Sequence, residues 1–158
     1  MPRIVSCLWF DRQAEEAARF YVSIFPNSKL GKIARYPEGL PGDRAGEVLT
    51  VEFELDGKPF TGLNGGPDFT FSEAISFQID VEDQAELDRY WQALLADGGV
   101  ESQCGWLKDR FGLSWQVVPV QLARLMASPD RAAAGRVAAA MMQMVKLDIA
   151  RLEAAAAG

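Results

Sequence analysis

Histidine is absent from all 158 residues of the chain, and this absence decides which chemistry the other residues could support. Histidine is the commonest metal ligand in proteins and the usual general base near neutral pH. Without it, Ser-His-Asp, Cys-His and histidine-metal sites are all excluded. Acid-base chemistry would therefore depend on other groups, above all carboxylates. Cys7 and Cys104 are too few and too far apart for a disulfide framework, so we expect two reduced thiols.

The candidate catalytic residue is Glu52, which lies in a segment of strict alternation. Over Val48–Leu55, apolar residues alternate with Thr50, Glu52 and Glu54, as in a strand that has one buried face. The polar residues then share the face turned away from the core. Glu52 could act as a general base there if burial raised its pKa. The alternative is that Glu52 lies on a solvated face, as most charged residues do.

Alternation in the other strands predicts a small-molecule site next to Glu52. Trp9 lies opposite Leu8 and Phe10, so it shares a face with polar rather than core residues. Aromatic walls with a few polar groups that orient a ligand are typical of binding pockets. We predict that the substrate-binding residues are Trp9, Asn64, Ser76, Gln78, Trp106 and Gln116. The alternatives are that Trp106 belongs to the core and that Asn64-Gly65-Gly66-Pro67 is only a tight connection.

The first half of the chain predicts one strand, a helix and three further strands. The helix starts near Gln13, where Asp11 could cap it, and Pro26 ends it. Asp56-Gly57 predicts a type I′ turn, because both residues readily adopt the left-handed conformation. The expected elements are strand 4–10, helix 13–25, strand 29–36, a loop over 37–46, strand 48–55 and strand 59–63.

The same pattern restarts 71 residues later, because Gln13-Ala14-Glu15 recurs as Gln84-Ala85-Glu86 and the apolar positions of the strands agree in this register. Two copies of a strand-helix-strands unit are therefore predicted. Asp83 and Glu86 have the spacing of a capping box. The expected elements are strand 74–81, a helix that ends at Gly98, and strands 105–108 and 113–118. The turn Lys108-Asp109-Arg110 could bind an anion at the mouth of the site or could be solvated.

The last forty or so residues predict a helical extension. Ser128-Pro129 is a strong helix start, and the alanine-rich segment that follows predicts one helix to about Ala156. Its apolar stripe must be buried either on the chain's own sheet or on a second subunit, and we favour the second subunit. The predicted domains are a unit over 1–120, with modules of about 1–68 and 69–120, and an extension over 121–158.

The acidic charge restricts the partners of the chain. Sixteen basic and 22 acidic residues give a formal charge of −6, which disfavours nucleic acid and anionic membrane surfaces. We find neither a signal peptide nor a segment that approaches the roughly 20 apolar residues of a membrane span. A cytoplasmic protein is therefore expected.

Several long motifs resemble those of the PhnB-like family, whose members often carry the label 3-demethylubiquinone-9 3-methyltransferase. The segments that carry the resemblance are Cys7–Asp11, Ala14–Tyr21, Leu63–Pro67, Cys104–Gln116 and Met144–Glu153. It implies the α+β fold of the vicinal-oxygen-chelate superfamily, which includes glyoxalase I, bleomycin-resistance proteins and extradiol dioxygenases. In that fold two βαβββ modules form a cupped sheet, and its members are commonly dimers.

The resemblance also implies where a metal would bind. The superfamily's ligand positions fall near Val5 or Ser6, near Ser76 and on Gln116, which together would not hold a divalent ion. We therefore predict no catalytic metal. A glycine-rich turn between a parallel strand and a helix, which usually binds S-adenosylmethionine, is missing, so we predict no cofactor.

Three functions follow from this sequence. The first is a protein that binds a small molecule without a metal, as bleomycin-resistance proteins do. The second is an enzyme that uses Glu52 as a base, or that acts on a quinone-like ring as the family label suggests. The third is a dimeric interaction module whose helical extension is the working part. We favour the first, with a homodimer as the expected assembly.

Overall fold

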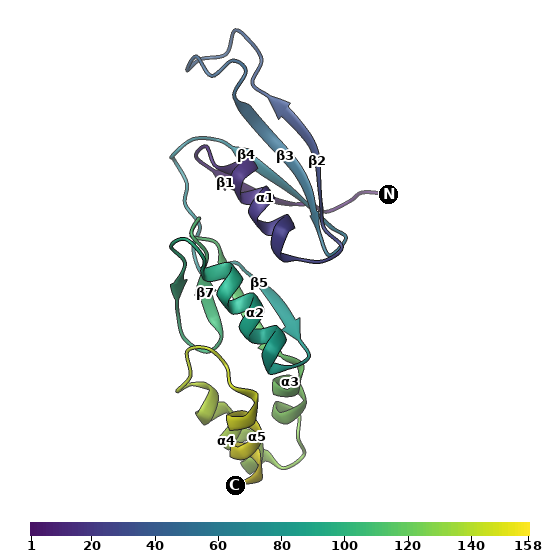
Figure 1. Ribbon diagram of the computed structural model, residues 1–158, viewed down its shortest axis with the longest axis vertical. Helices are drawn as coiled ribbons and strands as arrows, with labels where there is room; N and C mark the ends of the chain where they lie inside the picture. The colour runs from purple at the N-terminus through teal and green to yellow at the C-terminus, as the bar shows by residue number, and fades with distance from the viewer. The chain divides into compact units, whose positions relative to one another are not determined.

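The computed structural model describes residues 1–158 as two units, Met1–Thr70 and Phe71–Gly158 (Figure 1). Each unit contains one four-stranded sheet with its own strand order.

The first unit has the predicted strand-helix-strands order. Its strands form one sheet in the order β1-β4-β3-β2, in which β1 runs parallel to β4 and the other neighbours are antiparallel. The helix α1 covers one face of this sheet (Figure 1). The elements are β1 (Ser6–Phe10), α1 (Ala14–Ile24), β2 (Lys29–Arg35), β3 (Val48–Leu55) and β4 (Lys58–Asn64).

The second unit repeats this topology. Its strand order is β5-β8-β7-β6, again with the first strand parallel to the last. The predicted α+β fold of two tandem modules is therefore confirmed. The elements are β5 (Ser76–Val81), α2 (Gln84–Leu95), β6 (Val100–Glu101), β7 (Trp106–Lys108) and β8 (Ser114–Pro119). The short β6 was not expected, because two exposed residues carry no pattern.

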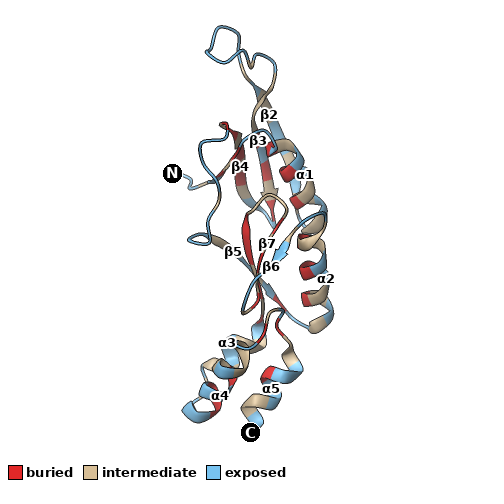
Figure 2. Ribbon diagram, turned by 90° about the vertical axis from the view of Figure 1, so that its left-hand side faces the viewer, coloured by how far each residue is buried: buried red, intermediate tan, exposed pale blue.

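Buried residues gather in the strands and on the helices α1 and α2, as Figure 2 shows in red. On β3, Val51, Phe53 and Leu55 are buried whereas Glu52 is exposed, so the predicted alternation is confirmed. The small residues at the start of α1 let it lie close to the sheet: a Cβ at Gly62 would stand 3.1 Å from the Cβ of Ala14. We call the side away from α1 or α2 the open face of each sheet.

Two local predictions are confirmed. Asp56 and Gly57 have φ angles of 49° and 71°, the left-handed values that a type I′ turn requires. Asp83 caps α2 by accepting a hydrogen bond from the backbone N–H of Glu86 at 2.8 Å. The Glu86 carboxylate in turn accepts from the N–H of Glu82 at 2.8 Å.

The C-terminal extension differs from the single helix that we predicted. It contains α3 (Val120–Met126), α4 (Arg131–Met141) and α5 (Ile149–Ala157). Asp130, rather than Ser128, caps α4 by accepting from Ala132 and Ala133. Between α4 and α5, the carbonyls of Met144 and Val145 accept hydrogen bonds from Cys104 and Gly105, and these bonds divide the helix.

The apolar side of the extension is partly covered within its own unit. Val137 and Leu152 are fully buried, as are Met144 and Leu147 in the connecting segment. Gln84 fixes this segment to α2, because its amide donates to the carbonyl of Leu147 and accepts from the N–H of Ile149. Of the predicted apolar stripe, packing within the chain buries Val137 and Leu152, whereas Met141, Val145 and Ile149 remain partly exposed.

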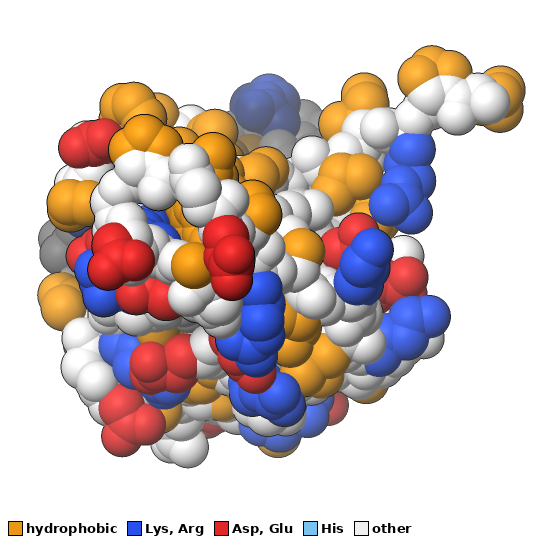
Figure 3. Space-filling model, turned by 90° about the horizontal axis from the view of Figure 1, so that it is seen from above, with side chains coloured by type: hydrophobic (Ala, Val, Ile, Leu, Met, Phe, Trp, Pro, Cys, Tyr) orange, Lys and Arg blue, Asp and Glu red, His pale blue; other side chains and the backbone are white.

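The five helices contain between 7 and 12 residues each. None of them combines the length and the apolar character that crossing a bilayer requires. Acidic and basic side chains lie beside one another on the face shown in Figure 3.

Candidate functional site

Glu52 lies on the open face of the first sheet, in a row that crosses three strands. The register pairs Cys7 of β1 with Thr61 of β4, and Thr61 with Glu52 of β3. The Glu52 carboxylate is exposed and has no hydrogen bond or ion pair within the chain. Beside it lies Gly31, where a Cβ would crowd Glu52, since it would stand only 3.1 Å from the Glu52 Cβ. The carboxylate is thus available to a ligand.

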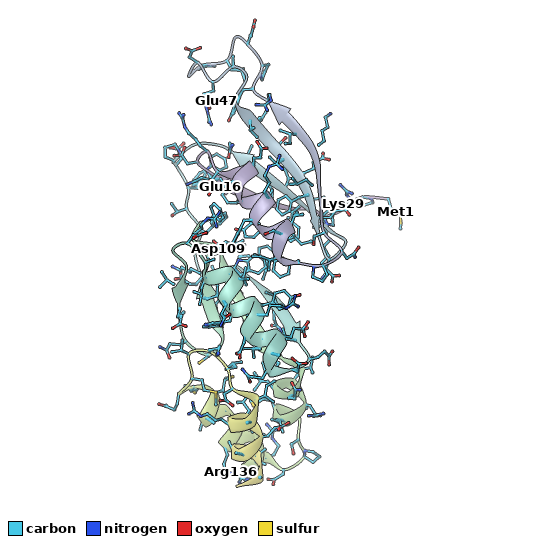
Figure 4. The ribbon with its side chains drawn as sticks, in the orientation of Figure 1. Met1, Glu16, Lys29, Glu47, Asp109 and Arg136 are labelled. Atoms are coloured by element: carbon cyan, nitrogen blue, oxygen red, sulfur yellow. The ribbon has the colours of Figure 1, made fainter.

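A shallow depression of about 100 Å³ surrounds Glu52. Its lining includes Arg3, Lys29, Glu54 and Thr61. Lys29 is paired with Glu54 at 3.2 Å, which leaves Glu52 as the carboxylate without a partner. Lys29 is labelled in Figure 4.

Trp9 lies in the next row of the same face, where the register pairs it with Leu63 and Leu63 with Thr50. Its indole N–H donates to the carbonyl of Gly66 at 2.9 Å. The ring of Phe69 meets the Trp9 ring edge-on, with the centroids 4.9 Å apart. Phe69 is 65% exposed, so the two rings form an accessible aromatic edge that the sequence did not reveal.

Asn64, predicted as a ligand-binding residue, is instead committed to the fold. It is 3% exposed, and its side-chain oxygen accepts from the N–H of Ala14 at 2.8 Å. Its amide nitrogen donates to the carbonyls of Arg12 and Val48. Asn64 therefore supplies the side-chain cap of α1 that we had predicted for Asp11, and we leave it out of the candidate site.

A cluster around Asn64 was missed by sequence reasoning, because its members are far apart in the chain. Tyr36 and Arg44 both donate to the backbone carbonyl of Asn64. Arg44 also bonds Glu47 at 2.8 Å, which lowers the pKa of the Glu47 carboxyl and raises that of Arg44. Glu47 is labelled in Figure 4. These contacts anchor the long loop 37–46 to the sheet.

The other four predicted ligand residues lie together on the open face of the second sheet. Gln78, Gln116 and Trp106 form one row across β5, β8 and β7. Ser76 precedes them on β5, and its hydroxyl oxygen accepts from the amide nitrogen of Gln116 at 2.9 Å. Trp106 is partly exposed on this face, whereas Trp115, which lies on the helix-facing side of β8, is buried. These four side chains thus share one accessible face of the second sheet.

The charged turn after β7 is partly buried rather than simply solvated. Asp109 is 3% exposed and accepts hydrogen bonds from the N–H groups of Phe111 and Leu113 and from the indole of Trp115. Figure 4 labels it. Lys108 is paired with Glu73. The turn therefore braces the β7–β8 hairpin.

Ser114 has a buried hydroxyl without any hydrogen-bond partner. It lies between Ser76 and Lys108 in the row next to Gln116. Replacing Ser114 with alanine removes this unsatisfied group, so we expect the free energy of unfolding to rise by about 1 kcal/mol. Urea denaturation measures the change. The matched variant Ser76→Ala loses a bonded hydroxyl and should not be stabilised, and destabilisation by Ser114→Ala would contradict the assignment.

No group of three or more His, Cys, Asp or Glu side chains is arranged to hold a metal ion. The residues also fail to fit a cofactor cradle at Gly65-Gly66, because a Cβ at Gly65 would stand 2.3 Å from the Trp9 ring. Gly65 makes room for the indole, whereas Gly66 adopts a positive φ of 105°.

Comparisons with known proteins agree on one family. Residues 2–118 match the family model described as 3-demethylubiquinone-9 3-methyltransferase. A PhnB protein from Bacillus cereus, whose name also includes this methyltransferase, is 32% identical with a TM-score of 0.66, over 75% of this chain and 100% of its own.

More distant structures share the fold. A protein from Pseudomonas aeruginosa is 21% identical with a TM-score of 0.62, over 75% of this chain and 98% of its own. The fosfomycin resistance protein FosX from Mesorhizobium loti is 15% identical with a TM-score of 0.54, over 81% of this chain and 100% of its own. No curated protein is similar enough to count as a match. The match over residues 2–118 and the similarity to the PhnB protein show that this chain belongs to the PhnB-like, 3-demethylubiquinone-9 3-methyltransferase family.

Proposed function

We propose that this protein binds a small organic molecule on the open faces of its sheets, without a catalytic metal. The observation that carries the proposal is the segregation of side chains. In both modules the face toward the helix is apolar and largely buried, whereas the open face carries aromatic rings and polar side chains that are at least partly exposed. Rings with a few oriented polar groups are the usual composition of small-molecule sites.

Three residues are proposed to carry this binding in the first module. Trp9 and Phe69 offer an aromatic edge, and Glu52 offers a carboxylate that no residue of the chain neutralises. A ligand that filled these positions would gain ring contacts and a charge-assisted hydrogen bond. In the second module the proposed residues are Ser76, Gln78, Trp106 and Gln116.

A second candidate function is an enzyme that uses Glu52 as a general base. The unpaired carboxylate favours it, because an uncommitted base next to open space can reach a substrate proton. Methyl transfer is not part of this proposal, since the glycine pair at residues 65 and 66 holds the Trp9 indole rather than a cofactor.

Glu52→Gln separates binding from catalysis, because it keeps the shape of the side chain and removes its charge. A screen of small organic molecules by thermal shift first identifies ligands; a ligand at 100 times its Kd stabilises by about 2.7 kcal/mol. We expect Glu52→Gln to leave the unliganded melting temperature unchanged, because the carboxylate makes no contact within the chain. Binding without turnover in both proteins supports a binding protein. Turnover that Glu52→Gln abolishes would establish the enzyme instead.

Glu54→Gln is the matched control, since Glu54 lies two residues away on the same face but is paired with Lys29. It should not alter turnover. If no ligand of any class shifts the melting temperature, the proposed function is wrong.

Two further predictions belong to this proposal. The homodimer is tested by analytical ultracentrifugation at micromolar concentration, and a monomer would contradict it.

The prediction that no catalytic metal is bound is tested by metal analysis of protein purified without a metal-affinity tag. Near-stoichiometric zinc, nickel, manganese or iron would contradict that prediction.

A further inference from the structure

We infer that the ligand of the second module is a flat, uncharged ring that carries two hydrogen-bond donors, and that Gln78, Gln116 and Trp106 recognise it. This inference rests on the proposed function and adds the chemical class of the ligand. It depends on how the two amides are held, on their spacing and on the charges around them.

Both glutamine side chains are held through their nitrogen atoms. The Gln78 amide nitrogen donates to a carboxylate oxygen of Asp80 at 2.7 Å, and that of Gln116 donates to the Ser76 hydroxyl at 2.9 Å. An amide held by its nitrogen has its oxygen turned to a fixed side. Neither amide oxygen accepts a hydrogen bond from within the chain. The row therefore presents two oriented acceptors.

The sheet sets the backbone spacing of the two glutamines that carry these acceptors. Gln78 and Gln116 are in register on the adjacent parallel strands β5 and β8, and neighbouring strands lie about 4.8 Å apart. Two donors in the 1,3 positions of a six-membered ring have a similar separation. A ring without donors would leave the acceptors unpaired, which is a strong basis for discrimination.

Trp106 supplies the wall for such a ring. It is in register with Gln116 on the other side of β8, and its side chain is partly exposed on the same face. An indole next to the acceptors gives a flat ligand an edge or stacking contact in addition to its hydrogen bonds. Three adjacent strands thus contribute one recognition group each.

The charges near the row disfavour an anionic ligand. Asp80 is negative and lies beside Gln78, while the nearest cation of the face, Lys108, is already paired with Glu73. A carboxylate or phosphonate would therefore meet two carbonyl oxygens and a carboxylate without a free positive charge. An uncharged donor meets no such repulsion.

Three probes that share one benzene ring and differ in their substituents test the inference on the full chain. Resorcinol carries two 1,3 donors, 1,3-dimethoxybenzene has the same ring without donors, and benzoate carries a negative charge. Binding is followed by the NMR signals of the Trp106 indole N–H and the glutamine side-chain amides. We expect resorcinol to bind with a Kd on the order of 1 mM, dimethoxybenzene at least about tenfold more weakly, and benzoate not at all.

Substitutions then test the acceptors themselves. Gln78→Met and Gln116→Met should each weaken resorcinol binding about fivefold or more, because methionine keeps the length but has no carbonyl. Gln116→Glu keeps acceptor oxygens and should retain binding. Gln92→Met, on the exposed side of α2, is the control and should change nothing. The thermal melting midpoint of each variant verifies that it is folded.

The outcomes separate this inference from the proposed function. Equal binding of dimethoxybenzene or benzoate, retained binding in both methionine variants, or no resorcinol binding would overturn the inference. If other ligands bind in the broader screen while resorcinol does not, the proposed function stands and the inference fails. If no molecule binds at all, both fail.

Discussion

Replacing Asp109 with alanine is expected to lower the free energy of unfolding of the second unit by about 4 kcal/mol. Its buried carboxylate accepts hydrogen bonds from two backbone N–H groups and from the Trp115 indole, at 2.9 to 3.1 Å. Alanine would leave all three donors without this acceptor. Urea denaturation followed by circular dichroism measures the loss.

Glu101→Ala is the matched control for Asp109, because Glu101 also accepts from an indole, that of Trp91, at 2.9 Å. Glu101 is exposed, so water can replace the lost acceptor. The free energy of unfolding should therefore change by less than about 1 kcal/mol. If Asp109→Ala prevents folding, Asp109→Asn still tests the role: it keeps one oxygen for the two N–H groups but turns a donor toward Trp115. Equal effects at positions 109 and 101 would show that the turn does not brace the hairpin.

Replacing Asn64 with alanine is expected to lower the free energy of unfolding of the first unit by about 3 kcal/mol. The Ala14 N–H would lose its acceptor at the start of α1, and the carbonyls of Arg12 and Val48 would lose their donor. Trp9 is the only tryptophan of this unit. Hydrogen exchange of the Trp9 indole and of the backbone amides of this unit, followed by NMR at increasing urea concentration, therefore reports on it, with the unsubstituted protein as reference.

Gln13→Ala is the control for Asn64, since Gln13 occupies the N-cap position of α1 but makes no side-chain cap hydrogen bond. It should change the free energy of unfolding by less than about 0.5 kcal/mol. A loss at Gln13 as large as that at Asn64 would mean that the helix is capped locally after all.

The sequence was most informative where the pattern of side chains is itself the cause of the structure. The alternation around Glu52 predicted β3 with the bounds that are observed, because a one-residue shift would place Val51 and Phe53 in solvent. The offset of 71 residues predicted the second module, because the same apolar positions support the same packing. The alternation of side chains along the strands also predicted which candidate residues share an open face.

The remaining features depend on partners distant in sequence. Asp11 is a reasonable cap for α1 when only neighbours are considered, yet Asn64 lies 50 residues away and reaches Ala14 because β4 ends beside β1. The segment between α4 and α5 has a composition compatible with helix, but Cys104 and Gly105 bind its carbonyls. Likewise, nothing near Asp109 indicates that Trp115 folds back onto it.

In both modules the strand made first, β1 or β5, lies at a sheet edge and pairs in parallel with the strand made last, β4 or β8. During synthesis on the ribosome, an early strand must therefore wait for its neighbour until the whole module has emerged. Long-range parallel pairing of this kind is slow. The amino-terminal module can nevertheless finish while its counterpart is still being translated, because no strand of one sheet is shared with the other. Ribosome-bound chains that extend far enough beyond Asn64 for β4 to leave the exit tunnel would thus already contain the complete first sheet.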